Sequence, residues 1–163
     1  MTRTITRAEA RWPEAGDPAA PPPLAGFVVS SFSPLVGAVA ERCLIRGYGD
    51  RTAAPARTAI VIVSPLGDVA SAIHVADAVD HRTRVGPLLF YQSVPNAVAG
   101  YVAARWGLAG PVVCTSPVGD ELADGLDVAR LLIDDGDCDA ALVVVVTDTA
   151  LAILVAPEPK ETP

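Results

Sequence analysis

Aromatic, histidine and lysine residues are scarce in this chain of 163 residues. It has three Phe, three Tyr, two Trp, two His and a single Lys. Its 12 basic residues stand against 19 acidic ones, which gives a net charge of −7. Nucleic acids and anionic membranes are bound through basic patches, so neither is an expected partner. With so few aromatic rings, the core must be built from small residues, above all the 28 Ala and 22 Val.

Cysteine is also rare, and the usual cofactor motifs are missing. Cys43, Cys114 and Cys138 are odd in number and widely spaced, which indicates no disulfide framework and favours a reducing cytoplasm. There is no Cys-x-x-Cys pair, phosphate-binding loop or Gly-x-Ser-x-Gly turn. We therefore expect no metal and no cofactor of the chain's own.

No segment is predicted to target or anchor the chain. The first residues lack the apolar run of a signal peptide. The most apolar stretch, 140–156, is interrupted by Thr147, Asp148 and Thr149 at its middle. A charge at a bilayer centre costs ~3 kcal/mol, so two strands joined by a turn are the better interpretation. These observations together predict a cytoplasmic protein.

The pattern divides the chain into one domain and two tails. Residues 1–25 are rich in Pro and Ala and are expected to form a flexible tail, as are residues 158–163. Residues 26–157 form the folded part. Within it, five apolar runs predict strands, at 27–30, 59–63, 111–115, 140–146 and 151–155.

Helices are predicted between these strands. One runs from Ser33 to a stop at Gly47, one opens at Gly67-Asp68, one opens at Ser93, and one spans 120–133. Alternating strands and helices are typical of an α/β fold. We expect a mixed, mainly parallel five-stranded sheet covered by helices, with the last strand antiparallel because a tight turn precedes it.

One stretch of about 60 residues, 86–146, is more specific. It contains Ser93-Val94-Pro95-Asn96, then Trp106-Gly107-Leu108-Ala109-Gly110-Pro111, then Gly136-Asp137-Cys138-Asp139-Ala140-Ala141-Leu142-Val143. This sequence resembles the N-terminal half of a β-ketoacyl synthase, a member of the thiolase superfamily. The resemblance extends over about 26–157 and implies a thiolase-like half-fold.

The resemblance also implies that the family's catalytic residues are missing. The family places a nucleophilic Cys in a turn between a strand and a helix, and in register that position is Gly119. Asp120 follows it; we interpret this residue as an ordinary helix cap. The family's two active-site histidines lie in a C-terminal half that has no counterpart in this sequence, and His74 and His81 match neither of them.

Cys114 is the alternative nucleophile, but it lies inside a predicted strand, where a cysteine usually serves packing. Arg82 and Arg84 are candidates to contact a phosphopantetheine phosphate or an acidic carrier protein, with solvated loop charges as the simpler alternative. Phosphopantetheine would then be present only on a partner acyl carrier protein. The candidate pocket or interface residues are Phe90, Asn96, Cys114, Thr115, Ser116, Gly119 and Asp120.

The leading hypothesis is a non-catalytic ketosynthase-like subunit, similar to chain-length factors. It would pair with an active ketosynthase in polyketide or fatty-acid-like synthesis and help to shape the acyl pocket or to dock a carrier protein. A lone half-fold would expose apolar surface on the helices at 94–106 and 122–133, which predicts a homodimer or a heterodimer. The alternatives are a small acyl-thioester enzyme that uses Cys114 or Asp120, and a self-assembling scaffold without a ligand.

Overall fold

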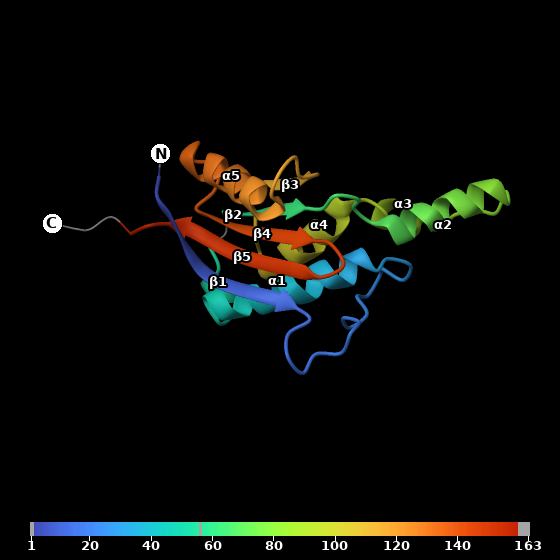
Figure 1. The fold of residues 1–163 in the computed structure, drawn as a ribbon, viewed down its shortest axis with the longest axis horizontal. Helices are drawn as coiled ribbons and strands as arrows, with labels where there is room; N and C mark the ends of the chain where they lie inside the picture. Colours follow the sequence, from blue (N-terminus) through green and yellow to red (C-terminus); the bar gives the residue numbers. More distant parts are fainter. Residues whose placement is uncertain (1, 56, 160–163) are drawn as a thin grey trace.

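The computed structural model describes residues 2–55 and 57–159, and within these residues one five-stranded sheet forms the centre (Figure 1). The strands are β1 (Thr4–Trp12), β2 (Thr58–Val63), β3 (Val112–Thr115), β4 (Ala140–Val146) and β5 (Ala150–Pro157). Their order across the sheet is β1-β5-β4-β2-β3. β2 is parallel to β3 and β4, whereas β5 is antiparallel to β4 and β1. The predicted mixed, mainly parallel sheet with an antiparallel last strand is confirmed.

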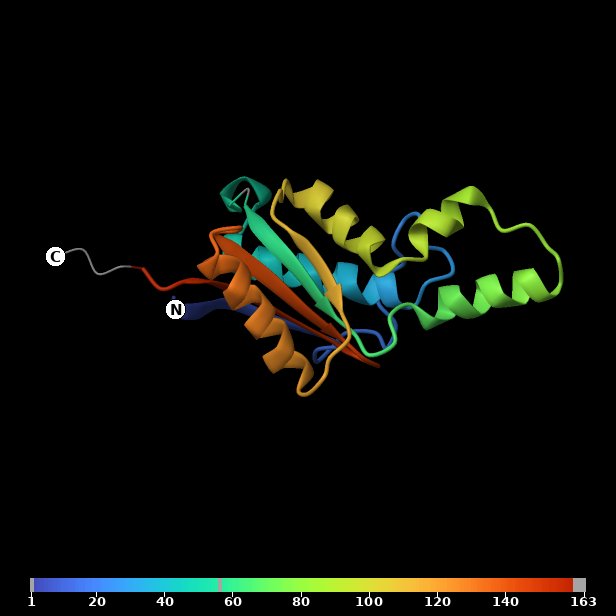
Figure 2. The same cartoon turned by 90° about the horizontal axis from the view of Figure 1, so that it is seen from above.

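Helices cover both faces of this sheet. The helices of the described residues are α1 (Phe32–Tyr48), α2 (Val69–Asp80), α3 (Pro87–Gln92), α4 (Pro95–Trp106) and α5 (Glu121–Asp134), with a 3₁₀ turn, η1, at Arg51–Ala53. α5 packs on one face, while α1 and α4 pack on the other, which gives three layers (Figure 1). α2 and α3 project from one end of the domain with their connecting loop at the far end (Figure 2). We call residues 66–94 the arm.

The central strands send alternate side chains to the two helical layers, because side-chain direction alternates along a strand. In β2, Ile60 and Ile62 belong to the core beneath α1 and α4. Ala59, Val61 and Val63 belong to the core beneath α5. Every residue of β2 is buried, which explains why this strand is a continuous apolar run rather than an alternating one.

Small residues bring α5 close to the sheet. A Cβ added at Gly125 would lie 2.7 Å from Val143 Cγ1 and 2.9 Å from Val63 Cγ2. Ala129, one turn further along α5, is fully buried. The abundance of small residues in the composition therefore allows tight packing between the helix and the sheet.

The N-terminal residues belong to the domain, so the expectation that residues 1–25 form a flexible tail is wrong. Thr4–Trp12 form β1, which pairs with β5 from end to end with one irregularity in register between Thr6 and Ala8. Ala10 and Trp12 are buried in the core beneath α1, whereas Glu9 and Arg11 are exposed. This alternation is the signature of a half-buried strand, and the proline-rich stretch beside it led the sequence interpretation astray.

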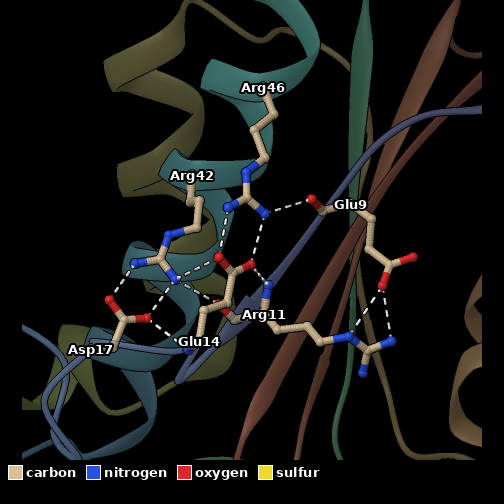
Figure 3. Close-up of polar contacts among 6 residues, drawn as sticks. All are labelled: Glu9, Arg11, Glu14, Asp17, Arg42 and Arg46. Atoms are coloured by element: carbon tan, nitrogen blue, oxygen red, sulfur yellow. Dashed lines mark hydrogen bonds and ion pairs between the residues drawn. The ribbon is translucent and has the colours of Figure 1, made fainter.

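Ion pairs hold the segment after β1 against α1 (Figure 3). The guanidinium of Arg46 donates to both carboxylate oxygens of Glu14, at 2.7 and 2.6 Å. Arg42, one turn earlier, donates to both oxygens of Asp17, at 2.7 and 2.8 Å. Its guanidinium carbon also lies 4.5 Å from the centre of the Trp12 ring. Two arginines four residues apart on one helix face thus fix the chain that follows the strand.

These contacts stabilise the charged forms of both carboxyl groups. Hydrogen bonds from the side chain of Arg46 and the backbone N–H of Arg11 lower the pKa of Glu14 to about 2. Hydrogen bonds from the side chain of Arg42 and the backbone N–H of Glu14 lower the pKa of Asp17. The carboxylates therefore stay ionised well below neutral pH.

The prediction of a strand at 27–30 is also wrong, because this stretch forms bends before α1. Phe27 is buried with its ring edge-on to Tyr101, with the ring centres 6.1 Å apart. Ser30 Oγ accepts a hydrogen bond from Ser33 N at 2.8 Å. The segment therefore anchors the start of α1 and supplies no strand to the sheet.

Three further boundaries differ from the prediction. α1 continues through Gly47 and ends at Tyr48, before Gly49, whose φ of 77° favours glycine. α4 begins at Pro95 rather than at Ser93, because 87–92 form the separate helix α3. The predicted tail at 158–163 is described only in part, because residues 160–163 lie outside the described residues. Within it, the backbone N–H of Glu158 donates to the Arg3 carbonyl at 2.8 Å.

Candidate functional site

The parallel strands β2, β3 and β4 end at the same edge of the sheet. Ser64 follows β2, Ser116 follows β3 and Thr147 follows β4. In open α/β sheets, ligands bind beside the carboxyl ends of such strands, because the connections leave a crevice there. This edge is therefore the candidate site.

Two clefts open at this edge, and the turn at 64–67 lines both of them. Cleft 1 has a volume of about 280 Å³ and cleft 2 one of about 240 Å³. Cleft 1 lies between this turn, the start of α1 and the end of β4; its other lining residues are Ser31, Phe32, Leu35, Val69, Val146, Thr147 and Asp148. Cleft 2 lies between the turn, β3 and the start of α4; its other lining residues are Ile62, Pro95, Cys114, Thr115 and Ser116.

The shared turn is fixed by local hydrogen bonds. Ser64 Oγ accepts from Gly67 N at 3.1 Å, and Gly67 has a φ of 65°. The buried Asp68 side chain then caps α2, accepting from Ser71 N at 3.1 Å and from Ser71 Oγ at 2.7 Å. The predicted helix start at Gly67-Asp68 is thereby confirmed.

Cys114 lies in β3 beside Ile62 of β2, half-buried, and lines cleft 2. Burial raises the pKa of its thiol to about 11. A nucleophilic cysteine needs the opposite shift, because the thiolate is the reactive form. The lining of cleft 2 includes neither histidine. Half-burial and a raised pKa are typical of a cysteine that packs in a core.

The two histidines lie away from these clefts. His74 is exposed on α2, and His81 is the exposed residue that ends this helix. The His81 ring Nδ1 lies 3.2 Å from a carboxylate oxygen of Asp77 on the preceding turn. Neither histidine is among the residues that line cleft 1 or cleft 2.

The turn 116–120, which we call the elbow, joins β3 to α5. Gly119 and Asp120 are exposed at its end, and neither lines cleft 1 or cleft 2. Asp120 Oδ1 accepts from Ala123 N at 2.8 Å, so Asp120 is the N-cap of α5. This agrees with the helix-cap interpretation of Asp120.

Asp124 of α5 contacts the elbow, and sequence reasoning missed this residue. Its Oδ2 accepts from Val118 N at 2.6 Å and from Gly119 N at 2.9 Å. These two backbone hydrogen bonds lower the pKa of the Asp124 carboxyl. The only signal in the sequence is a carboxylate in the first turn of a helix that already has an acidic cap, which does not by itself predict a contact back to the elbow.

Solved structures with a similar fold include several ketosynthases. The ketosynthase (ApeO) in complex with its chain length factor (ApeC) from Xenorhabdus doucetiae aligns with a TM-score of 0.71 and 18% identity, over 98% of this chain and 81% of that one. A β-ketoacyl synthase from Burkholderia phymatum STM815 aligns with a TM-score of 0.73 and 14% identity, over 97% of this chain and 60% of that one. The ishigamide ketosynthase/chain length factor aligns with a TM-score of 0.73 and 15% identity, over 91% of this chain and 49% of that one.

The chain has a ketosynthase-like, thiolase-type fold. The expected fold is therefore confirmed, and at these identities the comparison shows the fold alone. The sequence matches no protein-family model and no curated protein. This chain spans about half to four fifths of the length of the three chains.

Within this ketosynthase-like fold, the predicted site residues do not form one constellation. Cys114, Thr115 and Ser116 come together in cleft 2. Asn96 is exposed in the first turn of α4, and Phe90 is 72% exposed on α3. Arg82 and Arg84 are exposed in the loop between α2 and α3, at the far end of the arm.

The apolar faces predicted to need a partner lie elsewhere than expected. Val98, Val102 and Trp106 of α4 are buried within the domain, and so are Ala129 and Ile133 of α5. α1 and the sheet cover most of the apolar side chains expected to be exposed on these two helices, and the large apolar residues that stay exposed there are Val94 and Leu131. The exposed apolar side chains are instead concentrated on the arm.

Two general findings concern the described residues. Across 2–55 and 57–159, no helix is long and apolar enough to cross a membrane. Over the same ranges, no three His, Cys, Asp or Glu side chains are grouped as ligands for a metal ion.

Proposed function

We propose that this chain is a non-catalytic, ketosynthase-like subunit that associates with an active ketosynthase in polyketide or fatty-acid-like synthesis. The ketosynthase-like fold supports the class of protein. Gly119 at the nucleophile register supports the absence of an acyl-enzyme step, because glycine has no side chain to acylate. The observation that carries the proposal is the large exposed apolar surface of the arm, which a partner chain would bury.

The arm exposes eight large apolar side chains. They are 41–81% exposed, and they are Leu66, Val69, Ile73, Val79, Leu88, Phe90, Tyr91 and Val94. Phe90 and Tyr91 stack edge-on, with their ring centres 5.8 Å apart. Monomeric proteins rarely expose contiguous apolar patches above a few hundred Å². Aromatic anchors of this kind are typical of the centre of a protein interface.

The arm is also set apart from the domain, as an interface element would be. α3 contacts α4, whereas α2 has only sparse contact with the other elements. Figure 2 shows both helices extending beyond the sheet. Because the domain covers little of the arm, its apolar surface is available to a second chain.

A ketosynthase is the partner that the comparisons favour. Two of the similar structures are described as a ketosynthase with a chain length factor. Strand β3 offers a second contact, because it is an edge strand that pairs only with β2 in the described sheet. In the superfamily that the sequence resembles, the corresponding strand lies at the dimer axis, which supports a heterodimer that uses the arm and the β3 edge together.

Carrier-protein docking is the finer part of the proposal. Arg82 and Arg84 lie at the tip of the arm in a chain whose net charge is −7. They are therefore the basic groups placed to meet an acidic acyl carrier protein that visits the complex. Any phosphopantetheine would arrive with that carrier protein.

Co-expression with candidate ketosynthases tests the proposal. The wild-type chain should co-purify with one of them as a complex of defined stoichiometry by size-exclusion chromatography with light scattering. Phe90→Asp should abolish or strongly weaken the complex, because it places a charge in the buried centre of the interface. Leu131→Asp is the matched control, since Leu131 is 60% exposed on α5 outside the arm.

The outcomes separate the hypotheses. A chain that stays alone with every ketosynthase contradicts the proposal. A homodimer that Phe90→Asp dissociates, with no ketosynthase bound, supports the self-assembling scaffold instead. Equal loss of binding in Phe90→Asp and Leu131→Asp would show that the arm is not the contact surface.

A further inference from the structure

Two backbone amides of the elbow converge on one internal carboxylate. Val118 N and Gly119 N both donate to Oδ2 of Asp124, at 2.6 and 2.9 Å. Converging backbone amides of this kind stabilise the oxyanion in many acyl-transfer sites. Here the acceptor of both amides is instead the carboxylate of the chain's own helix α5.

Asp124 is not needed as the cap of α5. Asp120 already caps the helix through Ala123 N, at 2.8 Å. Glu121 adds a second acidic residue to the first turn. The contact of Asp124 is instead directed outside the helix, to the elbow, where Val118 is fully exposed. Its effect is thus on the elbow amides more than on the helix.

We propose that Asp124 closes the elbow as an internal anion, so that the chain lacks acyl chemistry for two independent reasons. One reason is that Gly119 supplies no nucleophile, which rests on the register used in the proposed function. The other reason is that Asp124 accepts the hydrogen bonds of the two elbow amides and places a negative charge beside position 119. Restoring a cysteine at position 119 therefore gives an unreactive thiol unless Asp124 is replaced too.

The geometry leaves room for this test. A Cβ built on Gly119 meets only Oδ1 of Asp124 within 4 Å, at 3.8 Å, and Gly119 does not have a left-handed φ. A cysteine therefore fits at position 119 without backbone strain. A cysteine at a helix N-terminus normally has a lowered pKa, whereas an adjacent carboxylate opposes the thiolate.

Alkylation of the isolated chain by iodoacetamide tests the inference. The variants are Gly119→Cys alone and Gly119→Cys combined with Asp124→Ala, Asp124→Asn or Asp127→Asn. Rates at position 119 are read by peptide mass spectrometry over a pH series, which separates them from the native cysteines. The Asp127 variant is the matched control, because Asp127 lies on the same helix and bonds Arg130 at 2.8 Å instead of the elbow.

The expected result is slow alkylation in Gly119→Cys and in its Asp127→Asn derivative. Asp124→Ala should raise the rate at neutral pH by about tenfold, through a thiol pKa lower by about one unit. Asp124→Asn keeps an acceptor but loses the charge, so it should give an intermediate rate. Circular dichroism and thermal unfolding confirm that each variant is folded.

Equal rates and equal pH profiles in folded Gly119→Cys and its Asp124→Asn derivative would overturn the inference. Rapid alkylation of Gly119→Cys alone would overturn it as well. Because no ketosynthase is present in this experiment, its failure is distinct from failure to form the proposed complex.

Discussion

Replacing Gly125 of α5 with alanine should destabilise the protein, although alanine favours helices. The new Cβ would lie 2.7 Å from Val143 Cγ1 and 2.9 Å from Val63 Cγ2. Both valines are fully buried in central strands, so neither methyl group can move aside without disturbing the sheet. The substitution therefore forces α5 away from the sheet or strains the core.

The expected magnitude follows from two opposing effects. Overpacking a well-packed core costs ~1–3 kcal/mol. Exchanging glycine for alanine inside a helix returns ~1 kcal/mol. We expect a net loss of ~1 kcal/mol in the free energy of unfolding, which lowers Tm by roughly 2–4 °C in a protein of this size.

Urea unfolding followed by circular dichroism measures this change. Gly100→Ala is the matched control, because Gly100 lies inside α4 and a Cβ there meets nothing within 4 Å. This control should be stabilised by ~0.5–1 kcal/mol, since only the helix preference changes. If Gly125→Ala stabilises the protein as much as Gly100→Ala, the close packing of α5 on β2 and β4 is refuted.

Three further predictions concern the ion pairs, the buried thiol and the arm. The pKa of Glu14 is lowered from its ordinary value of 4.5 to about 2, so its stabilising effect is complete above pH 4.5 and is lost as pH falls through about 2. Urea unfolding at a series of pH values should therefore show a free energy of unfolding that depends less on pH over this range in Glu14→Gln than in the wild type. An unchanged pH dependence would contradict the ion pair. Since burial raises the pKa of Cys114 to about 11, incubation with acyl thioesters should leave no adduct by mass spectrometry, and an adduct there would revive the enzyme hypothesis. Arg82→Glu combined with Arg84→Glu should weaken binding of an acyl carrier protein to the complex by calorimetry, whereas Arg130→Glu on α5 should not; equal effects would remove the arm tip as the docking site.

The sequence predicted the parts of the fold whose burial is complete on both faces. β2 and β4 are continuous apolar runs because α1, α4 and α5 cover both sides of them. The start of α2 at Asp68 and the cap of α5 at Asp120 followed from capping preference. Such local rules hold because they involve contacts within a few residues.

The sequence interpretation failed where long-range contacts decide the structure. β1 has a mixed, partly charged composition, and its place depends on pairing with β5 more than a hundred residues later. The arm was missed because apolar helices look alike in sequence whether a sheet covers them or not. The contact of Asp124 with the elbow depends on how the turn folds back on the helix, which spacing alone does not give.

The most direct test of the central claim is the product formed by a co-purifying ketosynthase, measured by mass spectrometry with and without this chain. If this chain is a partner of the ketosynthase, the identity or the amount of the elongation products should change when the chain is left out. Phe90→Asp should remove that dependence, whereas Leu131→Asp should retain it. A ketosynthase that makes the same products in the same amounts without the chain would contradict the account.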